Sequence, residues 1–257
     1  MENDEYRVMH DLEKSYWWFV GKQYLVRTHL TRLNIENLQQ PAILDIGAGT
    51  GIILKILERF GKAFGTELSF EAIRFLKERQ LNLIVRSDAN KNLPFRNESF
   101  SVITCLDVLE HLDRDSALLK EMFRVCRPGG YVLITVPSFQ AFWSPHDTAL
   151  HHKRRYTRSH ILTYVKKLRF KVLKASYYNM ILSIPIWTIR RIRSLFPQNE
   201  HPQSDFFISL PGALNRALTF LFAAEIYGLR FLNYPFGVSL LLILQKTDNT
   251  GDEDRKR

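Results

Sequence analysis

The residues that most clearly indicate chemistry are a carboxylate and three alternate glycines, Asp45, Gly47, Gly49 and Gly51. An apolar run precedes them and a helical pattern follows from residue 52 onward. A second apolar step ends at Glu67, 22 residues after Asp45. This arrangement is typical of a βαβ unit that binds a nucleoside, because the glycines let a ligand approach the turn and the later acid reaches the ribose hydroxyls.

The spacing of the glycines distinguishes between cofactors. Dinucleotide enzymes use G-x-G-x-x-G, whereas this turn reads D-x-G-x-G-x-G from Asp45 to Gly51. A carboxylate beside the turn repels a pyrophosphate and suits a ligand with an ammonium or sulfonium group. The turn resembles the first motif of the class I S-adenosylmethionine-dependent methyltransferases.

Later segments match the same family in order along the chain. They are Val85–Ala89, Leu93–Phe95 with Ser99–Ile103, Asp107–Leu112 and Arg127–Ile134. The resemblance implies an α/β fold with a Rossmann-like seven-stranded sheet of order 3-2-1-4-5-7-6 and an antiparallel last strand. It also implies S-adenosyl-L-methionine as the cofactor.

The resemblance further implies roles for individual residues. Asp45 and the three glycines are expected beside the methionine portion, and Glu67, followed by Leu68, at the ribose. Asp88 and Ala89 are expected at the adenine, and Leu106 and Asp107 near the sulfonium. We also expect Trp18 to cover the cofactor and Lys22 to lie near its carboxylate, although aromatic residues at 17–19 are equally typical of a core.

Candidates for the acceptor side follow the fourth and fifth strands. His111 suits a general base or a positioning residue, and a structural hydrogen bond is the alternative. His146 beside Asp147 forms a workable imidazole–carboxylate base. We expect His151, Arg154, Arg155 and Tyr156 to bind the substrate. A metal at residues 146, 147, 151 and 152 is disfavoured by the neighbouring cations, so we expect none.

Charge and composition limit the classes of partner that the chain is expected to bind. The net charge is +10, and residues 148–199 contain 12 Lys and Arg and no Asp or Glu. Such a segment favours an anionic partner: phosphate, acidic lipid headgroups or RNA. Cys105 and Cys126 read as core residues. An acidic, polar start and the lack of a long apolar run predict a cytoplasmic protein without a signal peptide, in contact at most with a membrane surface.

Four regions can be separated along the chain. Residues 1–40 form an N-terminal helical cap, with helical spacing over 23–33. Residues 41–180 and 237–247 form the cofactor-binding domain, with a helix over 157–168 and strands over 170–176 and 238–244. Residues 181–236 form an apolar helical insertion, which suits a lid, a membrane contact or a dimer interface. Residues 248–257 are a charged tail.

These features predict methyl transfer to oxygen on a small amphiphilic or anionic acceptor, such as a quinone precursor or a lipid-linked sugar. RNA methylation is the alternative that the basic segment allows, although no nucleic-acid-binding module is recognisable. A non-catalytic cofactor-binding scaffold is the third reading. The intact glycine turn with Glu67 and Asp88 argues against it.

Overall fold

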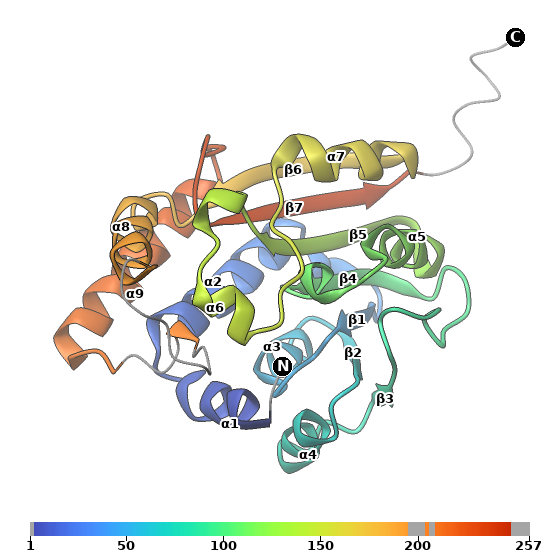
Figure 1. Cartoon of the computed structure of the whole chain (residues 1–257). Coiled ribbons are helices and arrows are strands. Elements are labelled where there is room, and N and C mark those ends of the chain that lie inside the picture. Colours follow the sequence, from blue (N-terminus) through green and yellow to red (C-terminus); the bar gives the residue numbers. More distant parts are fainter. Residues whose placement is uncertain (1–2, 195–203, 206–208, 248–257) are drawn as a thin grey trace, which may run out of the picture.

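A computed structural model describes residues 3–194, 204–205 and 209–247. Its centre is a seven-stranded sheet of order β3-β2-β1-β4-β5-β7-β6, in which β7 runs antiparallel to both neighbours (Figure 1). The strands are β1 (Ala42–Ile46), β2 (Lys62–Glu67), β3 (Ile84–Arg86), β4 (Phe100–Leu106), β5 (Cys126–Pro137), β6 (Phe170–Tyr178) and β7 (Ser239–Lys246). The predicted α/β fold and strand order are confirmed.

Helices cover both faces of the sheet, which is why its central strands are apolar on both sides. On one face pack α5 (Asp115–Val125) and α7 (Arg158–Lys167), against side chains such as Leu44 and Ile103. On the other face pack α3 (Ile52–Leu57), α4 (Phe70–Glu78) and α2 (Trp17–Arg32). Cys105 and Cys126 are free and buried, as their apolar surroundings predict.

The N-terminal helix α1 (Asn3–Leu12) and the first turns of α2 border the cavity at the carboxyl ends of the strands, and the rest of α2 packs on a face of the sheet. The pattern predicts a helix over 23–33, and α2 begins earlier, at Trp17; α1 precedes it. Gly21 allows the closest approach between α2 and the insertion, since a Cβ there would lie 2.0 Å from the Phe222 ring. The aromatic run therefore packs largely against another helix, with Trp17 5.8 Å from Phe222 between ring centroids.

The insertion between β6 and β7 is helical where it is described. It contains α8 (Ser183–Ser194) and α9 (Gly212–Leu229), and α9 packs along α2. Residues 195–203 and 206–208 of the insertion and the charged tail at 248–257 lie outside the described residues. No helix in the described part of the chain combines the length and apolarity that crossing a bilayer requires.

Short elements complete the loops around the sheet. They are η1 (Ile35–Asn37), η2 (Leu109–His111), η3 (Gln140–Phe142) and α6 (Pro145–Ala149). The helix predicted over 157–168 is present as α7, and the Thr157 hydroxyl accepts a hydrogen bond from His160 N, as an N-cap does. The strands predicted over 170–176 and 238–244 are present as β6 and β7, each of which continues for two more residues.

Candidate active site

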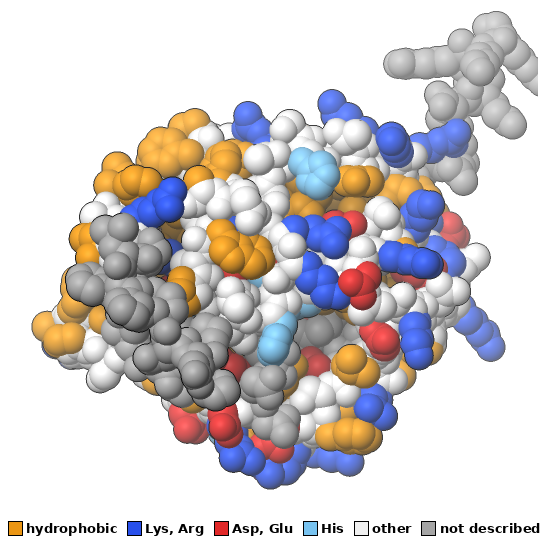
Figure 2. All heavy atoms as spheres, in the orientation of Figure 1, with side chains coloured by type: hydrophobic (Ala, Val, Ile, Leu, Met, Phe, Trp, Pro, Cys, Tyr) orange, Lys and Arg blue, Asp and Glu red, His pale blue; other side chains and the backbone are white. Residues whose placement is uncertain are grey.

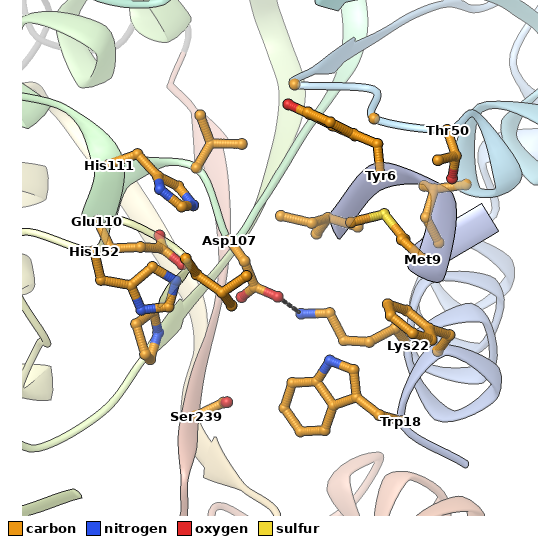
Figure 3. A pocket seen from close by; sticks show the side chains of 18 of the residues that line it. Tyr6, Met9, Trp18, Lys22, Thr50, Asp107, Glu110, His111, His152 and Ser239 are labelled. Carbon is orange, nitrogen blue, oxygen red and sulfur yellow. Dashed lines mark ion pairs between the residues drawn. The ribbon is translucent and has the colours of Figure 1, made fainter. Parts of the chain in front are cut away.

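A cavity of about 580 Å³ opens at the carboxyl ends of β1, β2 and β4. Parallel α/β sheets bind ligands at this edge. The cavity is bordered by the glycine turn after β1, by Tyr6 and Met9 of α1, by Trp18 and Lys22 of α2, and by the histidines that follow β4 and β5 (Figure 3). Ile186 and Ile189 of α8 and Leu218 of α9 close its apolar side.

The glycine turn is built from three residues in the left-handed region. Gly47, Gly49 and Gly51 have φ values of 72°, 54° and 92°. A Cβ on Gly47 would also lie 2.5 Å from Val108 Cγ2, so this position excludes side chains by space as well as by conformation. The backbone N–H groups of Gly47 and Ala48 both donate to Thr66 O at 2.9 Å, which fixes the turn against the end of β2.

Glu67 anchors the same turn through its side chain. One carboxylate oxygen accepts from Gly49 N at 2.9 Å, and the other accepts from Leu68 N at 2.7 Å and Ser69 N at 2.9 Å. The Glu67 carboxylate is therefore oriented at the cavity wall, with acceptor capacity to spare for a ribose. Leu68 is 49% exposed at the rim of the cavity.

Asp45 is buried below the turn. Its carboxylate accepts from Thr104 Oγ1 at 2.6 Å. Burial raises the pKa of Asp45 to about 7, against the Thr104 hydrogen bond, which favours the charged form. A cationic ligand in the cavity would stabilise the ionised carboxylate.

Asp88 and Ala89 line the cavity after β3, as the resemblance implies for the adenine end. Asp88 Oδ1 accepts from Asn90 N at 2.9 Å, so the carboxylate is held by its own loop. The second oxygen of Asp88 makes no hydrogen bond or ion pair with the described residues and remains available to an amine donor.

Lys22 and Asp107 form an ion pair across the cavity wall. Lys22 Nζ lies 2.7 Å from Asp107 Oδ2 and donates to Thr135 Oγ1 at 2.6 Å and Tyr178 OH at 2.9 Å. Burial alone would raise the pKa of Asp107, but the Lys22 charge holds it below its ordinary value. Lys22 was expected near the cofactor carboxylate; the structure places its ammonium at the end of β4. Trp18 borders the cavity and packs on Tyr178 and Phe222.

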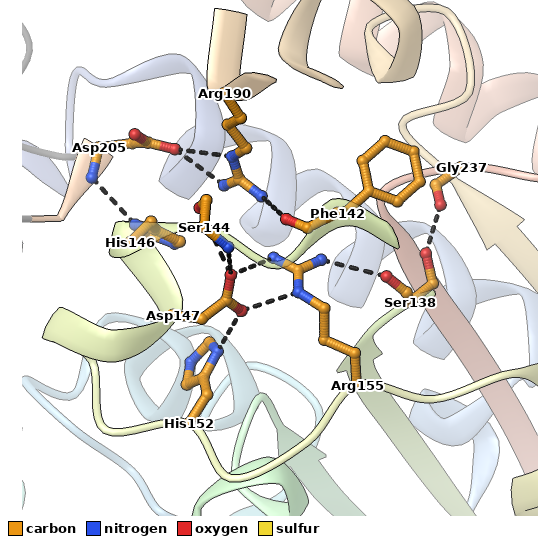
Figure 4. Close-up of polar contacts among 10 residues, drawn as sticks. All are labelled: Ser138, Phe142, Ser144, His146, Asp147, His152, Arg155, Arg190, Asp205 and Gly237. Carbon is orange, nitrogen blue, oxygen red and sulfur yellow. Dashed lines mark hydrogen bonds and ion pairs between the residues drawn. The ribbon is translucent and has the colours of Figure 1, made fainter. Parts of the chain in front are cut away.

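On the acceptor side, Asp147 pairs with a different histidine from the one predicted. His152 Nδ1 lies 2.9 Å from Asp147 Oδ1, and Arg155 donates to both Asp147 oxygens at 2.8 and 2.9 Å (Figure 4). These contacts lower the pKa of Asp147 despite its burial. The structure does not pair His146 with Asp147: adjacent residues of a helix project about 100° apart, and the Asp147 carboxylate turns to His152 and Arg155.

His146 contacts the insertion instead. Its Nδ1 accepts from Asp205 N at 2.9 Å, and Arg190 of α8 pairs with the Asp205 carboxylate at 2.8 Å (Figure 4). Burial lowers the pKa of His146 to about 4, so the ring is neutral near pH 7. Because Nδ1 already accepts a hydrogen bond, His146 is poorly placed to take a further proton at that nitrogen.

Three side chains converge beside this network. Ligand atoms of Glu110, His111 and His152 all lie within 4.8 Å of one another, and all three line the cavity. Burial lowers the pKa of His111 to about 3 and raises that of Glu110 well above its ordinary range. The sequence predicts no role for Glu110 within the Asp107–Leu112 motif, and it indicates His152 only as part of a disfavoured metal site.

The predicted substrate-binding residues are mostly engaged elsewhere. Arg155 borders the cavity, whereas His151, Arg154 and Tyr156 do not. The Tyr156 hydroxyl donates to Asp115 Oδ2 at 2.8 Å, and Arg154 pairs with the same oxygen at 3.2 Å. These contacts fix the loop after α6 to α5, which positions His152 without touching a ligand.

Comparisons with known proteins agree with this geometry. Residues 44–134 match the family model described as "Methyltransferase domain". The ubiquinone biosynthesis O-methyltransferase of Ralstonia nicotianae is 27% identical over 46% of this chain and 55% of its own length. The ubiquinone/menaquinone biosynthesis C-methyltransferase of Burkholderia vietnamiensis is 33% identical over 40% and 45%. The chain thus spans about half the length of these two curated relatives.

The fold likeness extends further along the chain. The crystal structure of an S-adenosylmethionine-dependent methyltransferase from Archaeoglobus fulgidus superposes with a TM-score of 0.55 at 19% identity, over 87% of this chain and 94% of that one. The two quinone relatives methylate different atom types by name, oxygen in one and carbon in the other. The likeness therefore does not select the methylated atom.

Proposed function

We propose that the chain, whose residues 44–134 match a methyltransferase domain, is a class I S-adenosylmethionine-dependent methyltransferase that methylates an oxygen of a small amphiphilic or anionic acceptor. One observation carries the proposal: a single cavity joins the glycine turn and Glu67 to an apolar wall from α8 and α9. A methyl donor at the turn would face an acceptor whose apolar part lies against Ile186, Ile189 and Leu218.

The donor side uses groups that are already held in place. Asp45 ionises against the positive charge of the methionine portion, Glu67 accepts from the ribose hydroxyls, and Asp88 accepts from the adenine amine. The glycines keep side chains out of the space that the cofactor fills. Each carboxylate is fixed by a hydrogen bond from the protein, so little reorganisation is needed on binding.

The reaction is an in-line displacement at the methyl carbon. The acceptor hydroxyl would pass its proton to water, its oxygen would bond to the methyl carbon, and the carbon–sulfur bond would break to leave S-adenosylhomocysteine. We place the acceptor oxygen beside Glu110, His111 and His152, because these side chains face the cavity across from α1 and α2 (Figure 3). His146 and Asp147 act as positioning residues, through Asp205 and His152 respectively.

The placement of two exposed cations of the basic segment favours a small acceptor over RNA. Lys167 and Lys171 are exposed at the end of α7 and the start of β6. Lys171 pairs in register with Gln245, which in turn pairs with Tyr131 near the start of β5. These charges therefore lie at the amino-terminal edge of the parallel strands, at the opposite edge of the sheet from the cavity.

The apolar surface of the insertion supports contact with an anionic membrane. Exposed side chains gather on α8, α9 and the following loop: Ile184 at 68%, Phe220 at 72% and Phe231 at 71%. Figure 2 shows hydrophobic side chains gathered on the side of the molecule where α8 and α9 lie. Arg191 and Arg230 accompany them, packed on Trp187, Tyr227 and Phe231.

The charge and the position of α8 and α9 both favour an anionic membrane as the partner of this surface. Of the acidic residues described between 181 and 247, Asp205 pairs with Arg190, and Glu225 is buried and accepts hydrogen bonds from the backbone ahead of α8. The same helices wall the cavity, so an acceptor embedded in lipid would reach it without crossing water. We accordingly propose a cytoplasmic enzyme that binds the inner face of the membrane through α8 and α9.

Cofactor binding and turnover test the proposal separately. Titration calorimetry with S-adenosylhomocysteine should show one site per chain. Glu67→Gln should weaken it about 10- to 100-fold, as expected for hydrogen bonds to a charged group. Glu58→Gln is the matched control, because Glu58 only pairs with exposed Lys55.

Turnover is then measured as S-adenosylhomocysteine release with a panel of amphiphilic phenols, amphiphilic carboxylates and short RNA. Release with a phenol or carboxylate supports the proposal. Release with RNA alone, or no cofactor binding at all, would overturn it.

A further inference from the structure

The cluster formed by Glu110, His111 and His152 contains three groups that can bind a metal ion, whereas a proton acceptor requires only one of them. Its side chains come from two segments, η2 after β4 and the loop after α6. Backbone hydrogen bonds lock these segments together: Lys153 N donates to Glu110 O at 2.7 Å, and His152 N donates to Asp147 O at 2.8 Å. These backbone contacts therefore hold the three side chains close together on one side of the cavity.

The Glu110 carboxylate has no partner among the described residues. The residue is 0% exposed, and neither side-chain oxygen makes a hydrogen bond. A buried carboxylate without a donor costs several kcal/mol, so such a group requires an explanation. The nearest cations do not supply one, because Lys22 pairs with Asp107 and Arg155 with Asp147.

One of the two imidazoles is held as a metal-binding histidine is. His152 Nδ1 lies 2.9 Å from the Asp147 carboxylate. The other nitrogen of His152 is thus left to face the cluster, where the His111 ring lies 4.8 Å away between ring centroids. A carboxylate or carbonyl behind the ring is the usual outer support of a histidine that ligates a metal.

We propose that Glu110, His111 and His152 bind a divalent transition-metal cation. Two imidazoles and one carboxylate favour Zn²⁺, Mn²⁺, Fe²⁺ or Co²⁺ over Mg²⁺ and Ca²⁺, which prefer oxygen ligands alone. Bonds of about 2.0–2.2 Å place tetrahedral ligands about 3.3–3.6 Å apart. Small side-chain rotations bring the present atoms, all within 4.8 Å, to that spacing.

The basic loop does not prevent this site. The sequence predicts no metal at residues 146, 147, 151 and 152 because cations surround them. The structure neutralises those cations in pairs, Lys153 with Asp113 and Arg155 with Asp147. Only His152 of that set belongs to the cluster, and the other two ligands come from the segment after β4.

The site deepens the proposed function, on which this step rests. With three protein ligands, the metal keeps a position open toward the cavity for an oxygen of the acceptor. A bound hydroxyl or phenol loses its proton to water more readily, and its oxygen then attacks the methyl carbon. The acceptor class narrows to molecules with a metal-binding hydroxyl or enol next to an apolar portion.

Metal binding by the untagged full chain tests the proposal without any turnover. Co²⁺ titrated into metal-free protein should give visible d–d bands and one equivalent per chain, and Zn²⁺ should displace it. Glu110→Gln and His152→Ala should each weaken Co²⁺ binding at least about 10-fold. His160→Ala is the matched control, since His160 is an exposed histidine on α7 outside the cluster.

Two further measurements make the outcome decisive. Thermal melts show that each variant is folded, and Glu110→Gln keeps the shape of the side chain. S-adenosylhomocysteine titration on metal-free protein reports the donor site separately, so its failure would remove the methyltransferase proposal and leave the metal result standing. The metal site would be overturned if the wild type gave no Co²⁺ bands. It would also be overturned if Glu110→Gln and His152→Ala bound Co²⁺ as tightly as the wild type.

Discussion

The two ends of the cavity are built in different ways. At the donor end, Asp45, Glu67 and Asp88 each accept a hydrogen bond from the protein, and the first two lie within one βαβ unit. At the acceptor end, the Glu110 carboxylate has no partner among the described residues, and its neighbours come from separate loops. The donor end thus has a protein partner for each carboxylate, whereas the acceptor end has a buried carboxyl group without a hydrogen-bond partner among the described residues.

This difference separates what the fold maintains from what the individual enzyme selects. A preorganised donor end tolerates few changes, because each carboxylate also fixes the chain around it. The acceptor end is assembled from η2, the loop after α6 and the insertion, all of which can vary without disturbing β1 or β2. The comparison predicts large effects at the glycine turn and graded effects toward the insertion.

The largest expected effect is at Gly47. In Gly47→Ala the new Cβ would lie 2.5 Å from Val108 Cγ2 at a φ of 72°, so the turn must move. Left-handed strain of about 1–2 kcal/mol and overpacking of about 1–3 kcal/mol together imply an affinity for S-adenosylhomocysteine about 100-fold lower. Titration calorimetry measures this loss.

Two further variants separate the effect of steric overlap with Val108 from the effect of left-handed backbone strain. Gly49→Ala has a φ of 54° but a nearest atom, Met9 Sδ, at 3.7 Å, so it should lose only about 10-fold. Val108→Ala combined with Gly47→Ala should recover part of the larger loss. Equal affinities for all variants would mean that the turn is not the donor site.

The second effect concerns the ion pair between the two ends. Lys22→Met leaves Asp107 charged and unpaired, and should lower the free energy of unfolding by about 2 kcal/mol in urea denaturation. The estimate is below that for a fully buried pair because the Asp107 side chain is 30% exposed.

Matched variants isolate the charge in this pair. Lys55→Met breaks an exposed pair with Glu58 and should cost less than about 0.5 kcal/mol. Adding Asp107→Asn to Lys22→Met should restore most of the loss. If Lys22→Met were as stable as Lys55→Met, the ion pair would not hold the two ends together.

The same contrast explains what could be predicted from the sequence. The glycine turn, Glu67 and the strand order follow from patterns of adjacent residues, because a βαβ unit is a local structure. The pairing of Asp147 with His152 could not be predicted, since it depends on how α6 turns the two side chains. Proximity in sequence suggested His146, which instead contacts Asp205, 59 residues away.

Glu110 was missed for a related reason. Glu110 precedes His111 in the Asp107–Leu112 motif, but only the fold shows that its carboxylate is buried and lies close to His152. Helix α2 illustrates the opposite case, in which packing overrides pattern. It extends back to Trp17 because the aromatic rings pack on Phe222 of α9, a contact between residues about 200 positions apart.

A third effect concerns pH at the donor end. The ligand-free pKa of Asp45, about 7, is above its ordinary value of 3.8, so the native state binds a proton that the unfolded chain has lost. The free energy of unfolding should therefore fall as pH rises between about 4 and 7. Affinity for the cationic donor should rise about 10-fold from pH 6 to pH 8, as the carboxylate ionises.

Asp45→Asn is the variant that isolates this carboxylate. It should flatten the fall in stability, measured by thermal melts across the same pH range, and remove the added pH dependence of donor affinity. The amino group of the donor titrates equally in both proteins, so only the difference between them is assigned to Asp45. An identical pH profile in the variant would place the donor's positive charge elsewhere.

The smallest expected effect is on the outer surface of the acceptor end. Phe231→Ser should lower binding to vesicles of phosphatidylglycerol and phosphatidylcholine about 5-fold, since a partly immersed ring contributes about 1 kcal/mol. Phe70→Ser is the matched control, because Phe70 is 70% exposed on α4, away from α8 and α9. Flotation of both variants on these vesicles and on pure phosphatidylcholine separates apolar from charge contributions. Equal losses for both variants would show that α8 and α9 are not the membrane contact. A dimer that forms without vesicles and protects Phe231 would show that this surface has a protein partner.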